Sequence, residues 1–571
     1  MAENSDLSVL IVDPNPGMRG NLHNMLAQAG ITKIDYAVSS GTAIRQLAKK
    51  PFDIVLCEYD LGNGSGEQNG QDGQQLLEDL RAHKLLPPSS IFIMLTSEGV
   101  YSKVIGAAEL TPTDYVLKPF TVDMLQQRMR RAITRRAVFL PVHQLAEAGN
   151  IGKAIEECRS REAANPAYAT DFARLRAELL MSKGEYAEAE LVYQIIVINR
   201  AIAWAQMGVA RCQFAQEKYA DACATLEGLL SAYPKFMAAY DLLARTHEAL
   251  GAQETAKKIL EDAVAISPNL VGRLRHLGEV ALETGDVVAA EKAFKQVVAK
   301  AKYSEFRDPE DHVKLVRTLV AKGDTGQISG VIRDMERSLR SSANVDACRA
   351  VAAGMLHEMT GNRKGAATEF SNAVSAIAVS RGLSTELKVG VVHSCLNAEL
   401  DAQASELMLN LMNDTDSGVS MDDAVQVFEK AGRHDLAEGM SKEIKHQVEE
   451  LIEHASEQRS QGDLRAAVDT LNAGLRKAPA NMSLALAATS AILKQLDDLG
   501  WEAQLGKHCA TLLGRMRLLD PHHAALAQLE AQFAHTQRKY GIAALVESEH
   551  QRAGDVRPVG DQVPRDKVQS A

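Results

Sequence analysis

Four polar residues stand at the ends of short apolar runs in the first part of the chain. They are Asp13, Glu58, Thr96 and Lys118. A carboxylate at the end of a buried strand is suited to accept a phosphoryl group, a reaction in which the attacking oxygen, the phosphorus and a metal ion must be held in line. Such chemistry ordinarily uses Asp. Glu58 is one methylene longer, so the alignment of an acceptor at this position becomes the main question that the sequence raises.

Strand-like and helix-like segments alternate over the part of the chain that carries these residues. Apolar runs predict strands at 7–12, 33–38, 54–57, 91–95 and 114–120, and helical spacing predicts helices at 18–28, 41–49 and from 122 onward. This alternation predicts an α/β doubly wound domain with a five-stranded parallel sheet. The working residues of such a domain lie beyond the carboxyl ends of the strands, so the four polar residues are expected to meet at one edge.

These segments resemble the receiver domain of two-component response regulators. The matching pieces are 10–13, 55–58, 72–73, 95–97 and 115–120. The resemblance implies that Asp13 is a ligand of Mg²⁺ and that Thr96 and Lys118 contact phosphoryl oxygens. It also implies that Tyr115 is the switch aromatic and that a histidine kinase is a partner.

Two positions depart from the receiver pattern. Pro14 stands where a second acidic residue is expected, and Glu58 stands where the phosphorylated Asp is expected. Mg²⁺ requires near-octahedral oxygen ligation, so the loss of a carboxylate at Pro14 predicts a weak Mg²⁺ site at best, and no cofactor is expected with certainty. Glu58 is expected to bring its carboxylate near Lys118 and Thr96, where phosphate oxygens would otherwise lie. The glycine-rich segment 62–71 lengthens the loop that follows.

Three interpretations of this receiver stay open. It is permanently activated by Glu58, it is an inert structural domain used for docking, or it is phosphorylated at Asp60. Asp60 is two positions beyond Glu58 and shares its side only if the strand continues. The register of Asp60 is wrong for the acceptor.

The remainder of the chain is internally repetitive, with a period of about 34 residues. Gly251 and Gly285 are separated by 34 residues, as are Ala256 and Ala290. This pattern resembles the tetratricopeptide repeat. The residues that carry the packing are Tyr240, Ala244, Gly251, Ala256, Leu260, Pro268, Gly278, Gly285, Ala290 and Phe294. Small residues let two helices approach, large apolar residues fill the space between hairpins, and Pro stops the second helix. Stacked hairpins form a solenoid, and the resemblance implies a protein partner in its groove.

These patterns divide the chain into a receiver-like domain, a connecting helix, a repeat region and a tail. The expected boundaries are 7–125, 126–148, 149–540 and 552–571, with the repeats clearest at 170–304 and also visible at 347–380 and 448–481. The tail is polar and is expected to be disordered. The stretches 305–345 and 375–447 keep helical periodicity but lose the spacing, which predicts degenerate repeats.

Composition excludes several function classes. The chain has 571 residues and a net charge of -11, so general attraction to nucleic acid or to an anionic membrane is not expected. No apolar run approaches the ~20 residues that span a bilayer, and a cytoplasmic location is expected. The Cys residues are scattered and are expected to be buried, reduced thiols. Five Arg residues between 128 and 136 are interpreted as a solvated helix face.

The sequence therefore predicts a bacterial, cytoplasmic response regulator of two-component type that acts through protein–protein interaction and is not an enzyme. No nucleophile triad or phosphate-binding loop stands out. The alternatives are a conventional regulator phosphorylated at Asp60 and a purely structural repeat scaffold. Homodimerisation is left open.

Overall fold

The computed structural model divides the chain into two compact units, Met1–Asn362 and Arg363–Ala571. The structure describes residues 6–62, 72–97, 112–200, 202–268, 270–301, 307–340, 342, 344–414, 417, 419–478, 481–520 and 523–540. The predicted tail at 552–571 and nearly all of the glycine-rich segment 62–71 lie outside these residues. In the described part of the chain, no helix has the length and apolar character needed to cross a membrane.

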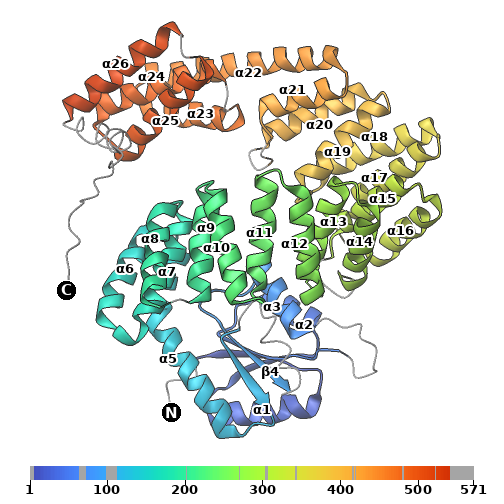
Figure 1. Ribbon diagram of the computed structural model, residues 1–571, viewed down its shortest axis with the longest axis vertical. Helices are drawn as coiled ribbons and strands as arrows, with labels where there is room; N and C mark the ends of the chain where they lie inside the picture. Colours follow the sequence, from blue (N-terminus) through green and yellow to red (C-terminus); the bar gives the residue numbers. More distant parts are fainter. Residues whose placement is uncertain are drawn as a thin grey trace, which may run out of the picture. The chain divides into compact units, whose positions relative to one another are not determined.

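A five-stranded parallel sheet opens the first unit, with strand order β2-β1-β3-β4-β5 (Figure 1). The strands are β1 Ser8–Val12, β2 Lys33–Ala37, β3 Ile54–Glu58, β4 Ile91–Ser97 and β5 Asp114–Lys118. The described helices around it are α1 Pro16–Gln28, α2 Ser40–Leu47, α3 Gly73–Ala82 and α5 Val122–Glu147. Strand order reverses beside β1, so the carboxyl ends of β1 and β3 flank the point at which such sheets place their sites. The predicted doubly wound fold is confirmed.

The helices cover both faces of the sheet, because the central strands are apolar on both sides. On one face, Ile44 of α2 and Leu77 of α3 pack against the strands. On the other face, Leu22 of α1 and Met129 of α5 do the same. The sheet thus separates two hydrophobic cores.

Polar residues fix where two of these helices begin. Ser39 accepts a hydrogen bond from the backbone N–H of Thr42 at 3.3 Å, before α2. Asp72 accepts one from the backbone N–H of Gln75 at 2.8 Å, before α3. Both residues form capping boxes, which satisfy backbone donors that the first turn of a helix leaves unpaired. The backbone N–H of Gly73 also donates to the carbonyl oxygen of Tyr59 at 2.7 Å, which sets the start of α3 close to the end of β3.

Helix α5 belongs to two hydrophobic cores. Leu125 and Met129 lie in the core of the sheet, whereas Phe139 and Val142 lie in the first core of the helical region. The helix is continuous from Val122 to Glu147 although it contains Pro141. One element therefore joins the two folds.

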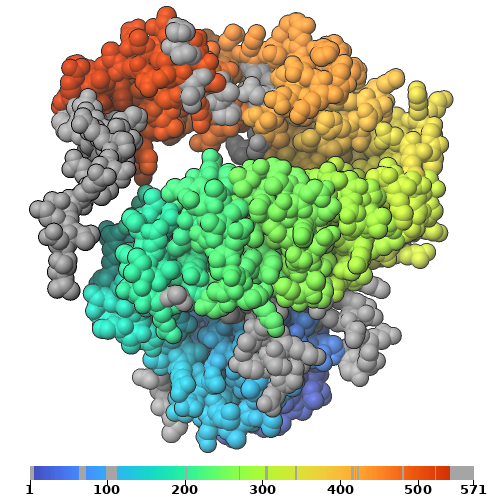
Figure 2. Space-filling model, viewed as in Figure 1, coloured from blue at the N-terminus to red at the C-terminus, as the bar shows by residue number. Residues whose placement is uncertain are grey.

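Paired antiparallel helices form the rest of the first unit (Figure 1). They are α6 Ile151–Ala164, the 3₁₀ helix η1 Pro166–Tyr168, α7 Ala169–Ser182, α8 Tyr186–Asn199, α9 Ala203–Ala215, α10 Tyr219–Ala232, α11 Met237–Ala249, α12 Gln253–Ile266, α13 Val271–Glu283, α14 Val287–Ala301, α15 Pro309–Lys322, α16 Thr325–Ser338 and α17 Val345–Met359. Each helix packs on the next, and Figure 2 shows the green part of the chain as one continuous surface. This arrangement confirms the predicted all-α solenoid of tetratricopeptide type.

The second unit is also helical in its described residues. Its helices are α18 Arg363–Val379, α19 Thr385–Asn397, α20 Asp401–Asn413, α21 Met421–Lys430, α22 His434–Ser460, α23 Leu464–Lys477, α24 Met482–Leu499, α25 Ala503–Leu519 and α26 Ala524–Lys539. Helix α22 contacts α21 before it and α23 after it, so this long helix contributes to two hairpins.

Glycine ends the first helix of several hairpins because the turn needs a left-handed backbone. Gly251 has φ 75° and Gly285 has φ 80°. Glu217 makes the corresponding turn between α9 and α10 with φ 60°, a conformation that costs a residue with a side chain roughly 1–2 kcal/mol. Tertiary packing therefore holds this turn where the sequence lacks the usual residue.

Close helix packing explains the small residues of the repeat. A Cβ on Gly278 would come within 2.7 Å of the ring of Phe294, and a Cβ on Gly208 would come within 2.5 Å of the ring of Tyr193. Glycine thus makes room for an aromatic ring on the neighbouring helix. The remaining packing residues divide by burial: Ala244, Ala256, Leu260 and Ala290 are fully buried, Tyr240 is partly buried and Pro268 is exposed.

All seven cysteines are free thiols, and all except Cys223 are buried. Burial raises the pKa of the Cys395 thiol to about 11 and the pKa of the Cys509 thiol to about 12. High thiol pKa values disfavour the reactive thiolate. These cysteines therefore act as small apolar residues of the cores.

Candidate functional site

Three charged side chains meet at the carboxyl edge of the sheet. Asp13 follows β1, Glu58 is the last residue of β3, and Lys118 is the last residue of β5. The ammonium group of Lys118 forms an ion pair with Oε2 of Glu58 and lies 3.9 Å from Oδ2 of Asp13. The side chains are 2% exposed at Asp13, 12% at Glu58 and 25% at Lys118. We call this group the receiver pocket.

The start of α1 fixes Asp13. Its Oδ1 accepts a hydrogen bond from the backbone N–H of Asn15 at 2.7 Å, and its carbonyl oxygen accepts one from the guanidinium of Arg19 at 2.6 Å. Its Oδ2 has no hydrogen-bond partner among the residues that the structure describes. The cation that faces this oxygen in the pocket is Lys118. Asp13 therefore presents one carboxylate oxygen to the centre of the pocket.

The backbone of Glu58 is held by its neighbours. A Cβ on Gly73 would come within 2.6 Å of the Glu58 carbonyl oxygen, so only glycine lets α3 begin there. The thiol of Cys57 donates a hydrogen bond to the same oxygen at 3.2 Å. Burial, followed by the charge of Glu58, raises the pKa of Cys57 well above its usual value. The side chain of Glu58 therefore starts from a rigid point.

Thr96 is completely buried, but the structure does not join it to the ion pair. Its hydroxyl donates a hydrogen bond to the carbonyl oxygen of Ser97 at 3.4 Å. Of the two contacts expected for the Glu58 carboxylate, the one with Lys118 is present, and no hydrogen bond to Thr96 is recorded in the described part of the chain. The hydroxyl thus lies near the edge without sharing the charge network.

Asp60 lies outside the strand. β3 ends at Glu58, and Asp60 is exposed. Its carboxylate accepts a hydrogen bond from the backbone N–H of Gly62 at 3.0 Å, and its own N–H donates to Oε1 of Glu58 at 3.2 Å. The condition that the strand continues to Asp60 is therefore wrong, because the chain turns at this point.

Tyr115 packs against the core under α2 and α3, together with Tyr59. Tyr59 donates a hydrogen bond from its hydroxyl to Oδ2 of Asp72 at 3.5 Å. Burial raises the pKa of Tyr59. Burial also raises the pKa of Asp72, although the hydrogen bonds that its carboxylate accepts act in the opposite direction. Sequence reasoning missed Tyr59, although an aromatic residue directly after Glu58 was a signal for it.

The receiver pocket does not fit a magnesium ion. The Lys118 ammonium lies between the two carboxylates, at the place where a cation bound by both would be needed. Pro14 supplies no side-chain oxygen, and the described residues contain no group of three or more His, Cys, Asp or Glu side chains that could hold a metal ion. Mg²⁺ commonly uses one or two protein carboxylates and several waters, and here the Lys118 ammonium already lies against both carboxylates that could serve it.

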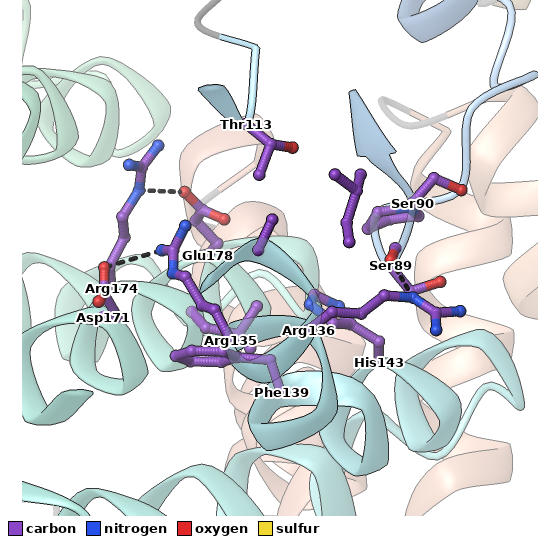
Figure 3. Close-up of a pocket in the computed structure, with 14 residues that line it drawn as sticks. Ser89, Ser90, Thr113, Arg135, Arg136, Phe139, His143, Asp171, Arg174 and Glu178 are labelled. Atoms are coloured by element: carbon purple, nitrogen blue, oxygen red, sulfur yellow. Dashed lines mark hydrogen bonds and ion pairs between the residues drawn. The ribbon is translucent and has the colours of Figure 1, made fainter. Parts of the chain in front are cut away.

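The predicted solvated face of α5 holds for Arg128, Arg130, Arg131 and Arg135, which are exposed, whereas Arg136 is partly buried. Three of the five arginines also form ion pairs. Arg128 pairs with Asp114, Arg135 pairs with Asp171 of α7, and Arg136 pairs with Asp53. Figure 3 shows Arg135 directed toward Asp171 beside a cavity of about 220 Å³. Arginine therefore fastens α5 both to the sheet and to the first repeats.

The same cavity is lined by a largely buried histidine. His143 of α5 lies beside Arg135 and Arg136 in Figure 3. Burial lowers the pKa of His143, against the nearby carboxylates. The side chain of Arg136 also donates to the carbonyl oxygen of Ser89 at 2.8 Å. The arginines of the cavity are thus engaged with other residues of its wall.

Comparison with known proteins follows the division seen in the fold. The response regulator receiver domain family matches residues 9–130, and a tetratricopeptide repeat family matches residues 204–235. The chemotaxis protein CheY-3 of Vibrio cholerae is 29% identical over 132 residues, which cover 23% of this chain and 95% of that protein. Residues 9–130 therefore form a receiver domain, and tetratricopeptide repeats follow it.

Solved structures match each part separately. The receiver domain of NtrX from Brucella abortus has 21% identity and a TM-score of 0.20, and covers 22% of this chain and 98% of its own. The C-terminal part of a tetratricopeptide repeat protein from Cytophaga hutchinsonii has 12% identity and a TM-score of 0.34, and covers 43% of this chain and 96% of its own.

A receiver joined to interaction repeats has the organisation of a two-component response regulator with a protein-interaction region. Both kinds of domain are signalling or binding modules without catalytic machinery of their own.

Proposed function

We propose that this protein is a response regulator whose receiver is held in one state by Glu58 and whose repeats bind a protein partner. Glu58 takes the position of the phosphorylated Asp in this proposal. The observation that carries it is the ion pair between Glu58 and Lys118 inside the receiver pocket. The proposed parts are the receiver at 7–125, the connecting helix at 126–148 and the repeats at 149–540.

The Glu58 carboxylate gives Lys118 the negatively charged partner that a phosphoryl group would otherwise give it. By resemblance to receivers, Lys118 contacts phosphoryl oxygens, and here its ammonium already contacts a carboxylate fixed to β3. An incoming phosphoryl group would have to displace Glu58 and would place its negative charge beside Asp13. Because the pocket does not fit a metal ion that would offset that charge, transfer is disfavoured.

The same ion pair argues that the receiver has a fixed conformation. Glu58 and Lys118 end two strands on either side of β4, and the partly buried ion pair connects them. Removing one partner of such a pair costs more than removing one partner of an exposed pair, because the other charge stays desolvated. Tyr115, the proposed switch aromatic, is then held with the rest of β5. In this proposal the repeats carry the output to a protein partner.

Labelling with radioactive acetyl phosphate tests the first part of the proposal. We expect no incorporation into the wild-type chain or into Asp60→Asn. The double variant Pro14→Asp with Glu58→Asp restores two carboxylates of the receiver pattern, and we expect it to take label in the presence of Mg²⁺. Wild-type labelling that disappears in Asp60→Asn or in Glu58→Gln would overturn the proposal and favour the conventional regulator.

A structural scaffold is the competing function, since the hydrogen bonds and ion pairs described for the receiver pocket all stay within the receiver. Affinity purification with the wild-type chain and with Glu58→Gln separates the two functions. We expect Glu58→Gln to recover less of the partner, because the ion pair sets the state of the receiver. Equal recovery from both proteins, with both folded by circular dichroism, would favour the scaffold.

A further inference from the structure

One face of α9 carries aromatic and basic side chains that are only partly buried, or exposed. Trp204, Met207, Arg211 and Phe214 follow each other at spacings of three and four residues, so they share one side of the helix. Arg211 is exposed and the other three are partly exposed. Cys212, on another side of α9, is completely buried.

Arginines from the two neighbouring hairpins extend this face. The guanidinium of Arg174 on α7 lies over the ring of Trp204 at 4.9 Å, and that of Arg245 on α11 lies over the ring of Phe214 at 5.4 Å. The first helices of three successive hairpins are thereby linked into one surface. We call it the arginine–aromatic strip, which consists of Arg174, Trp204, Met207, Arg211, Phe214 and Arg245.

Two of the three arginines of the strip keep a positive charge that no described carboxylate pairs with. Arg174 pairs with Glu178 at 3.0 Å, but among the described residues no carboxylate lies within 4.0 Å of Arg211 or Arg245. The next repeat behaves differently, because Arg275 forms a bidentate pair with Asp311 at 2.6 and 2.9 Å. A guanidinium that is stacked on a ring and lacks a carboxylate still offers its N–H edge to a ligand.

We propose that the arginine–aromatic strip recognises an acidic segment of the protein partner, with carboxylates on Arg211 and Arg245 and apolar side chains on Trp204 and Met207. This inference rests on the proposed function of the repeats and names the chemistry of their partner. Planar guanidinium groups match carboxylates in two-point hydrogen bonds, and partly exposed aromatic rings supply apolar contact area at low entropic cost.

A single-stranded nucleic acid is the other ligand that arginine and aromatic side chains serve. Its affinity comes from neutralising several phosphates along a basic groove. The strip has two arginines without a carboxylate and the chain has a net charge of -11, so the charge balance favours a short acidic peptide.

Selection from a phage library of random peptides about 12 residues long, with the full chain immobilised, tests the inference. We expect the selected peptides to be rich in Asp or Glu together with aromatic or leucine residues. A synthetic selected peptide should bind Arg211→Gln or Arg245→Gln about tenfold more weakly than wild type, the effect of one charge-assisted hydrogen bond. Arg211→Lys should bind with an affinity between those of wild type and Arg211→Gln, because an ammonium keeps the charge but cannot make the two-point contact.

Arg333→Gln is the matched control, because it removes an exposed Arg from α16, outside the strip. Circular dichroism checks that each variant is folded. Selected peptides of neutral or basic composition, or equal binding by the strip variants and Arg333→Gln, would overturn this inference while leaving the peptide-binding function intact. Recovery of no peptide at all would overturn both. Tighter binding of an oligothymidylate than of any acidic peptide would overturn the inference and assign the strip to nucleic acid.

Discussion

In the receiver pocket one ammonium group serves two carboxylates, whereas in the repeats a buried guanidinium has a carboxylate of its own. Lys118 lies against Glu58 and Asp13. Arg273, with a side chain that is 0% exposed, forms a bidentate pair with Asp241 at 2.7 Å. A shared cation leaves one negative charge in the pocket without a cation of its own, whereas a matched pair leaves none. We therefore expect the charges of the receiver pocket to set the state of the receiver, and the charges of the Arg273 pair to hold helices together.

The largest expected effect lies in the aromatic packing of the repeats. Phe294→Ala removes a fully buried ring from α14 and should lower the free energy of unfolding of the repeats by about 4 kcal/mol. Urea unfolding in a Trp501→Phe background measures this, since Trp204 is then the only tryptophan left of the two. Val288→Ala, on the same helix at a position 73% exposed, should change stability by less than about 0.5 kcal/mol. Equal effects of both variants would contradict the packing argument.

Loss of one partner from a matched pair should come next. Asp241→Ala takes the bidentate carboxylate from buried Arg273, and we expect a loss of about 3 kcal/mol in the same urea assay. Combining it with Arg273→Met should recover most of that loss, because no charge then remains buried. If the double variant is as unstable as the single one, the pair does more than neutralise charge.

The receiver should respond most to a change in its backbone packing. Gly73→Ala sets a Cβ within 2.6 Å of the Glu58 carbonyl oxygen and 2.9 Å of the Met94 sulfur, so α3 must shift. We expect this shift to lower the free energy of unfolding by about 2 kcal/mol. Hydrogen exchange of the β3 and β4 amides reports the loss. Gly228→Ala on α10, where a Cβ meets nothing within 4 Å, should stabilise slightly. Unchanged exchange in Gly73→Ala would show that the receiver edge is softer than the repeats.

The strained turn between α9 and α10 offers a gain in stability. Glu217→Gly relieves a φ of 60° and should add about 1 kcal/mol, measured by the midpoint of urea unfolding. Glu217→Ala keeps the strain and serves as the control, with little or no gain expected. A gain of the same size from both substitutions would mean that the side chain, not the backbone, is unfavourable here.

The pair between His276 and Glu248 in the repeats should have the smallest effect on the free energy of unfolding, and this effect should depend on pH. His276 lies 2.5 Å from Glu248; burial opposes its protonation, but the hydrogen bond and charge of Glu248 raise the pKa overall. A raised pKa in the folded state means that the stabilisation is complete below the unfolded value of about 6.5 and is lost as pH rises through the folded value. Wild type should lose roughly 0.5 kcal/mol relative to His276→Gln between about pH 6 and pH 9. If the difference in stability between wild type and His276→Gln stays constant across that pH range, the pair does not contribute pH-dependent stability.

Sequence patterns predicted the sheet and the hairpins because both depend on local periodicity. The apolar runs located the strands, and the spacing of Gly251 and Gly285 located two hairpin turns. The contact between Glu58 and Lys118 was also predicted, since the ends of parallel strands converge. Two features were not. The hydroxyl of Thr96 bonds to a neighbouring carbonyl oxygen, and the pair that Arg135 forms depends on how α7 folds back on α5, which no local pattern encodes.

The number of residues of α5 between its two hydrophobic cores cannot change without consequence. Ala132 is anchored in the sheet core and Phe139 in the first helical core, so the stretch of helix from one anchor to the other sets both a distance and an angle. One residue inserted there would turn everything beyond it by about 100° and move it by about 1.5 Å. One of the two anchors would then leave its core. The number of residues in this stretch, more than their identity, therefore sets the rotational phase between the receiver and the first repeats.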